Sequence, residues 1–127
     1  MSTKPIWTRL IAIGVALAMP VLLFAPLAVE SAAPSGLDKA VHFVMFGLFL
    51  WSLGVLFPRA SRLAAAAIAI GTGALTELVQ GFVGRDPSWG DLVADGLGVG
   101  LALFLWSAWR GFRPRRALKP FVHSVTE

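Results

Sequence analysis

The 127-residue sequence contains no cysteine and few charged residues. Without cysteine the chain forms no disulfide and no thiolate metal site, and it has no cysteine nucleophile. Charged residues make up 14% of the chain, against roughly 25% in a typical soluble domain. Apolar residues make up 57%, more than a soluble chain of this length could cover with polar surface. The composition excludes an ordinary soluble enzyme and a disordered tail. The basic residues form no binding face, so we expect no nucleic-acid partner.

Four long apolar runs dominate the sequence. A membrane-spanning helix needs about 20 mostly apolar residues. The runs cover about residues 10–29, 40–57, 63–84 and 91–109. We therefore predict an all-α membrane protein with four transmembrane helices, forming a single domain over residues 1–110. A basic tail follows over residues 111–127.

Lysine and arginine are unevenly distributed between the two ends of the predicted helices. If the N-terminus lies inside, nine of these residues fall on the inner side, and only Lys39 and Arg85 fall on the outer side. The positive-inside rule then places both termini in the cytoplasm. The basic tail would rest on anionic lipid headgroups, or dock a partner.

The first run also resembles a secretory signal peptide. Lys4 and Arg9 precede it, and small residues follow it around positions 31–33. We expect the run to be retained as a helix, because the apolar part of a signal peptide is usually only about 7–15 residues long. Cleavage would leave three spans in the same orientation.

The remaining polar residues gather at one end of the predicted bundle, which the topology places outside. They begin the second run, end the third and begin the fourth: Asp38, Lys39, His42, Glu77, Gln80, Arg85, Asp91 and Asp95. Acidic residues outnumber basic ones there, which favours protons, cations or amine-bearing ligands over bare anions. Arg85, Lys39 and His42 could still hold one phosphate, because arginine presents a planar fork of donors.

Glu77 is the residue of this group whose position is hardest to explain by a structural role alone. It lies about 10 Å below the end of its helix, at 1.5 Å per residue. An ionisable residue inside a membrane is a functional hypothesis by default. Gly73 and Gly81 lie one turn away on either side, so we expect this face to pack closely against another helix. The structural alternative is a polar lock of Glu77, Arg85 and Asp95 that holds the helices in register.

Small residues mark a second close helix contact, in the fourth run. Asp91, Asp95, Gly98 and Ala102 form a stripe that passes from polar to small along one helix face. Small residues on one face let a neighbouring helix approach closely. The stripe predicts that the fourth helix packs tightly along this face.

Other polar residues have structural explanations. Ser88 followed by Asp91 fits a capping box, in which both side chains accept hydrogen bonds from free backbone N–H groups. Asp38 can cap the second helix, and His42 can be a packing residue. The carboxylates and the histidine match no known metal-site spacing, so we predict no metal site and no cofactor. A G-x-S-x-G nucleophile motif is absent.

Taken in order, these residues resemble the VanZ-like family of small bacterial membrane proteins. The resemblance rests on Asp38-Lys39-x-x-His42-Phe43, Phe46, Thr76-Glu77-x-x-Gln80, Gly84-Arg85 and Asp91-Leu92-x-Ala94-Asp95-x-x-Gly98. It implies an integral protein of the bacterial cytoplasmic membrane. The family's name comes from a protein associated with teicoplanin resistance, so a cell-envelope role is implied, but no reaction. Asp95 is a departure, because the family usually has asparagine there.

Two functional hypotheses remain open. In the first, the outer polar cluster binds an envelope lipid, a lipid-linked wall intermediate or an amine-bearing glycopeptide, with an effect on glycopeptide susceptibility. In the second, the chain is a small membrane enzyme with Glu77 as general acid or base, His42 as its partner and Arg85 as an anion clamp. Proton-coupled transport ranks last, because the ionisable residues lie at only one depth. Membrane lipids are the expected partners, and a second copy of the chain is a further one.

Overall fold

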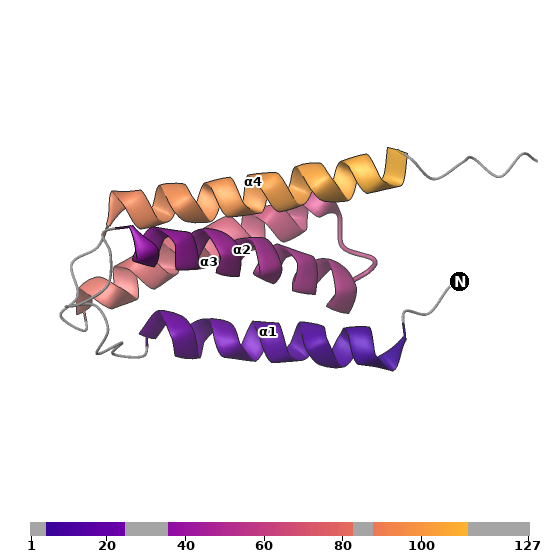
Figure 1. Cartoon of the computed structure of the whole chain (residues 1–127), viewed down its shortest axis with the longest axis horizontal. Helices are drawn as coiled ribbons and strands as arrows, with labels where there is room; N and C mark the ends of the chain where they lie inside the picture. The colour runs from indigo at the N-terminus through magenta and orange to yellow at the C-terminus, as the bar shows by residue number, and fades with distance from the viewer. Residues whose placement is uncertain (1–4, 25–35, 83–87, 112–127) are drawn as a thin grey trace, which may run out of the picture.

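The computed structural model describes residues 5–24, 36–82 and 88–111, and every regular element within them is an α-helix (Figure 1). The helices are α1 (Ile6–Phe24), α2 (Leu37–Leu56), α3 (Arg62–Phe82) and α4 (Trp89–Gly111). All four are long and apolar enough to cross a membrane. The predicted all-α architecture with four candidate spans is therefore confirmed for the described chain.

The helices begin earlier than the apolar runs predicted. α1 begins at Ile6 and α2 at Leu37, several residues before the corresponding runs. Apolarity marks the part of a helix that suits a membrane interior, whereas backbone hydrogen bonding starts wherever the chain can initiate a helix. Predicted residues 25–29 and 83–84 lie outside the described part of the chain.

Local sequence sets these starting points. Gly36 precedes α2 with φ at 99°, a left-handed conformation that glycine adopts without steric cost. No side chain caps α2, so the expectation that Asp38 does so is wrong, and Asp38 lies instead in the first turn. Ser61 caps α3, where its Oγ accepts a hydrogen bond from the Ala64 N–H at 3.0 Å.

The centre of the bundle is the pairing of α2 with α4, which contact each other more extensively than any other two helices of the described chain. Gly98 makes this approach possible, because a Cβ there would collide with the Phe43 carbonyl group. Gly47 faces the same contact, and a Cβ on it would lie 3.3 Å from the Gly98 carbonyl oxygen. The tight packing predicted from the small stripe of the fourth helix is thus confirmed.

The antiparallel order of the helices brings four helix ends together. The last turns of α1 and α3 lie at the same end as the first turns of α2 and α4 (Figure 1). We call this the polar end, because it holds the described polar residues of the predicted cluster: Asp38, Lys39, His42, Glu77, Gln80, Asp91 and Asp95. At the opposite end, Arg62 stacks 5.5 Å from the Trp106 ring and donates to Ser107 Oγ at 2.9 Å.

Candidate functional site

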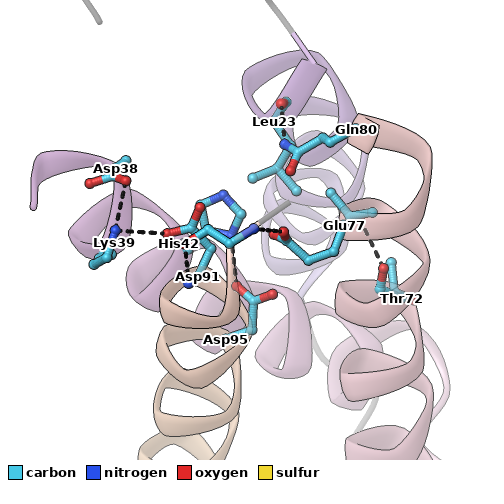
Figure 2. Close-up of polar contacts among 11 residues, drawn as sticks. Leu23, Asp38, Lys39, His42, Thr72, Glu77, Gln80, Asp91 and Asp95 are labelled. Atoms are coloured by element: carbon cyan, nitrogen blue, oxygen red, sulfur yellow. Dashed lines mark hydrogen bonds and ion pairs between the residues drawn. The ribbon is translucent and has the colours of Figure 1, made fainter. Parts of the chain in front are cut away.

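Three ionisable side chains from three helices converge inside the polar end. His42 of α2, Glu77 of α3 and Asp95 of α4 point toward one another (Figure 2). One potential ligand atom from each lies within 4.8 Å of the others. Their exposed fractions are 6%, 8% and 1% respectively. We call these residues the inner trio. The sequence predicted all three as site residues, and the fold brings them together.

Each carboxylate of the inner trio is held by one of its two oxygens. His42 Nδ1 lies 2.9 Å from Asp95 Oδ1. The Ser88 backbone N–H donates to Glu77 Oε2 at 2.7 Å. Glu77 Oε1 and Asp95 Oδ2 are buried and have no hydrogen-bond partner among the described residues. A buried acceptor without a partner is unfavourable by about 1–3 kcal/mol, and more when it is charged.

Gly73 and Phe46 shape the space around Asp95. A Cβ on Gly73 would lie 2.7 Å from Asp95 Oδ2, so only glycine leaves room for the carboxylate in this position. Phe46 is fully buried and stacks on the His42 ring, with 6.2 Å between the ring centroids. The predicted close packing of this face of α3 is confirmed at Gly73, which lies against the Asp95 side chain of α4. It is wrong at Gly81, which is exposed.

Lys39 lies outside the inner trio and pairs with two other carboxylates. Its Nζ lies 2.9 Å from Asp38 Oδ2 and 3.3 Å from Asp91 Oδ1. Its side chain reaches α4 by crossing Gly90, where a Cβ would meet Lys39 Cε at 2.6 Å. The Lys39–Asp38 pair is about half exposed and contributes little to stability. Lys39 is therefore engaged away from the two unpartnered oxygens.

The predicted capping box at the start of α4 forms only in part. The Asp91 backbone N–H donates to Ser88 Oγ at a long 3.4 Å. The reciprocal half is wrong, because the Ser88 N–H donates to Glu77 instead of Asp91. The Asp91 carboxylate accepts from Lys39. The start of α4 is thus tied to both α3 and α2.

Gln80 contacts a different part of the bundle. Its Nε2 donates to the Leu23 carbonyl oxygen at 3.0 Å, which joins α3 to the last turn of α1 (Figure 2). This hydrogen bond gives the buried Gln80 a structural role. Gln80 is therefore not counted with the inner trio. Arg85 lies outside the described residues, and so do its predicted roles as anion clamp and as part of a polar lock.

Sequence reasoning missed three contributors to the site. The Ser88 backbone N–H is a group that every residue type except proline carries, and the Leu23 carbonyl is one that all residue types carry, so no sequence signal marks them. Phe46 was noted only as part of a motif, and its stacking on His42 depends on packing that the sequence does not display.

A groove of about 480 Å³ runs beside Glu77, between the last turns of α3 and the first turns of α4. Its walls are almost entirely apolar, and its polar lining residues are Glu77 and Ser88. The apolar lining consists of Ala74, Leu78, Gly81, Phe82, Trp89 and Leu92. Phe82 and Trp89 are more than four-fifths exposed, so the groove opens at the outer surface of the bundle. An apolar groove ending on a buried carboxylate suits an amphiphilic ligand.

Comparison with family models, with curated proteins and with solved structures found no match for this chain. The resemblance to the VanZ-like family therefore stays a prediction, as do the functions drawn from it.

Proposed function

We propose that the chain is a VanZ-like protein of the bacterial cytoplasmic membrane whose polar end binds the amine-bearing polar group of an envelope amphiphile. Both termini would lie in the cytoplasm, and the polar end would face outward. The observation that carries the proposal is the buried, unpartnered Oε1 of Glu77 next to an apolar groove.

Charge and hydrogen-bonding capacity favour an amine. An ionised carboxylate only accepts hydrogen bonds, whereas an ammonium group offers three donors. Lys39 is engaged by Asp38 and Asp91, so it does not neutralise Glu77 or Asp95. A cationic group placed against Glu77 would offset the burial of its charge, which a bare phosphate would aggravate.

The groove favours a ligand with an apolar part. Its volume of about 480 Å³ falls in the range of small-molecule sites and could hold a segment of an acyl chain. An amine and an apolar part occur together in phosphatidylethanolamine, in lipid-linked wall intermediates and in lipoglycopeptides such as teicoplanin. These ligands share the recognised chemistry, so the experiment must separate them.

Native mass spectrometry of the purified chain tests the proposal. The protein is mixed with phosphatidylethanolamine, an amine-bearing lipid-linked wall precursor or teicoplanin, and with phosphatidylglycerol as an amine-free reference. Glu77→Gln removes the charge with little change of shape. Asp38→Asn is the matched control, because Asp38 is an acidic residue at the same end that lies outside the groove.

We expect one amine-bearing ligand to bind the wild type at least about tenfold more tightly than phosphatidylglycerol does, equivalent to about 1.4 kcal/mol. Glu77→Gln should abolish this preference, and Asp38→Asn should retain it. Equal binding of amine-bearing and amine-free lipids, or equal binding by wild type and Glu77→Gln, would contradict the proposal.

The enzyme hypothesis has one observation in its favour. His42 is hydrogen-bonded to Asp95 at 2.9 Å, an arrangement that orients an imidazole for proton transfer, and Glu77 lies close by. It predicts turnover of an outer-leaflet lipid or wall precursor by the purified chain, whereas the binding hypothesis predicts recovery of the ligand unchanged. Analysis of the ligands after incubation separates the two.

A further inference from the structure

We propose that the inner trio of His42, Glu77 and Asp95 forms a binding site for a divalent transition-metal ion, with Zn²⁺ as the favoured ion. The proposal goes beyond the amphiphile groove, and it shares Glu77 Oε1 with it, so an ion bound there would compete with an amine for this oxygen. It also reverses the expectation of no metal site, which rested on spacing along the chain. The fold brings together ligands from three helices that the sequence keeps far apart.

The two carboxylates of the inner trio are buried without full hydrogen bonding. Glu77 and Asp95 are more than nine-tenths buried, and each carries one oxygen without a hydrogen-bond partner among the described residues. Two ionised carboxylates buried side by side are costly to keep together unless a proton or a metal ion neutralises them. A divalent ion would neutralise both charges at once, whereas Lys39 is engaged elsewhere.

The contacts around the two carboxylates also suit an ion. The Ser88 N–H fixes Glu77 Oε2 and leaves Oε1 free for an ion. Ligating carboxylates in metal sites are themselves commonly hydrogen-bonded in this way. His42 Nδ1 and Asp95 Oδ1 lie 2.9 Å apart, close to the separation of two neighbouring ligand atoms on one zinc ion, so neutral His42 would bind through Nδ1 beside the Asp95 carboxylate. Gly73 preserves the space at Asp95 Oδ2, which a methyl group there would fill.

The donor set favours zinc over magnesium or calcium. Imidazole nitrogen suits zinc, while magnesium and calcium prefer oxygen ligands in larger numbers. Zinc ligand atoms lie about 2.0–2.2 Å from the ion. One ligand atom of each residue lies within 4.8 Å of the others. Side-chain rotations that move the carboxylate oxygens by about 1 Å would bring all three ligand atoms into contact with one ion. Three protein ligands would leave a fourth position open, as in catalytic zinc sites.

Metal titration of the purified full chain in detergent micelles tests the proposal. Zn²⁺ binding is measured by calorimetry after chelation and dialysis, with Mg²⁺ as the reference ion. Co²⁺ replaces Zn²⁺ in a parallel titration, because its visible spectrum distinguishes four- or five-coordinate sites from the six-coordinate aqueous ion.

We expect one Zn²⁺ per chain, little Mg²⁺ binding and an intense Co²⁺ spectrum typical of a low coordination number. Asp95→Asn and Glu77→Gln should each weaken Zn²⁺ binding by more than about tenfold. Asp38→Asn, an exposed acidic control, should bind as the wild type does. Absence of stoichiometric Zn²⁺ binding, an aqueous-type Co²⁺ spectrum or an equal loss in Asp38→Asn would each overturn the site. The Co²⁺ spectrum of the wild type tests the metal site even if a variant fails to fold.

Ala74→Leu separates this proposal from the amphiphile site. Ala74 lines the groove and is not one of the metal-binding candidates, so a leucine there should obstruct the amphiphile and leave Zn²⁺ binding unchanged. Zn²⁺ binding that is absent while amphiphile binding persists overturns the metal site alone. Loss of Zn²⁺ binding in Ala74→Leu would show that the ion does not occupy the inner trio.

Discussion

Glu77 and Asp95 are placed where a purely structural design would not put them. Both carboxylates are buried, and each leaves one oxygen without a partner among the described residues. Such groups lower stability unless a ligand offsets them. Sites that bind ligands often retain such unfavourable features, because the binding interaction depends on them.

Glu77→Gln should therefore stabilise the ligand-free protein, by about 1–3 kcal/mol, because it removes a buried charge and adds a donor near Asp95. The free energy of unfolding in mild detergent gives the measurement. A polar lock between helices predicts the opposite sign, so a clear loss of stability would favour the structural alternative.

Gln80→Leu is the control substitution for the unfolding free energy measured with Glu77→Gln. Gln80 has a satisfied hydrogen bond to the Leu23 carbonyl, and leucine has a similar size but no donor. We expect a loss of about 0.5–1.5 kcal/mol, the usual net value of a hydrogen bond. Opposite signs for Glu77→Gln and Gln80→Leu would separate a binding residue from a structural one.

Most residues of the site could be identified from the sequence. The depth of Glu77 in an apolar run marked it directly, and the i, i+4 spacing of Asp91 and Asp95 placed both near one helix end. The partners could not be predicted. Ser88 caps α4 as its residue type indicates, but its N–H donates to Glu77 because α3 and α4 meet there, which only the fold determines.

At the scale of elements, the tight contact between α2 and α4 depends on glycine. Gly98 and Gly47 face each other across this contact, and a side chain at Gly98 would collide with the Phe43 carbonyl group. The small stripe in the sequence predicted that α4 packs closely but did not identify α2 as its partner. Apolar runs determine where helices form, whereas the choice of neighbour depends on how side chains fit together.

Gly98→Ala should destabilise the bundle by about 1–3 kcal/mol, the usual range for overpacking, because the backbones of α2 and α4 must move apart. Gly100→Ala is the matched control on the same helix, since a Cβ there meets nothing within 4 Å. We expect it to be neutral, or stabilising by up to about 1 kcal/mol through better helix propensity. Equal effects of the two substitutions on the unfolding free energy would show that the close approach is unimportant.

At the scale of the whole molecule, the orientation of the polar end determines which ligands it can meet. The distribution of lysine and arginine predicts that the polar end faces outward. Arg62 lies at the opposite end, where it contacts Trp106 and Ser107. An outward polar end would face the outer leaflet and externally added glycopeptides, whereas an inward one would face the inner leaflet and the cytoplasm.

Single-cysteine labelling can determine this orientation, because the chain has no cysteine of its own. Leu37→Cys places a partly exposed thiol at the polar end, and Ala60→Cys places one in the loop at the other end. A membrane-impermeant maleimide should label Leu37→Cys in intact cells and Ala60→Cys only after permeabilisation. The reverse pattern would place the polar end in the cytoplasm.

Glycopeptide susceptibility gives a test in cells. The resemblance to the VanZ-like family predicts that expression of the wild type lowers susceptibility to teicoplanin, and that Glu77→Gln at a matched membrane level does not. Minimum inhibitory concentrations provide the readout. Equal protection by both proteins would show that the Glu77 carboxylate is not the functional feature.

The most direct test asks whether an amine-bearing amphiphile occupies the groove beside Glu77. A lipid with a primary-amine head group and a photoreactive acyl chain is crosslinked to the protein in vesicles, and the labelled residues are mapped by mass spectrometry. We predict crosslinks concentrated on Leu78, Phe82 and Trp89, which are lost in Glu77→Gln and retained in Asp38→Asn. Crosslinks spread evenly over all four helices, or an unchanged pattern in Glu77→Gln, would contradict binding at the polar end.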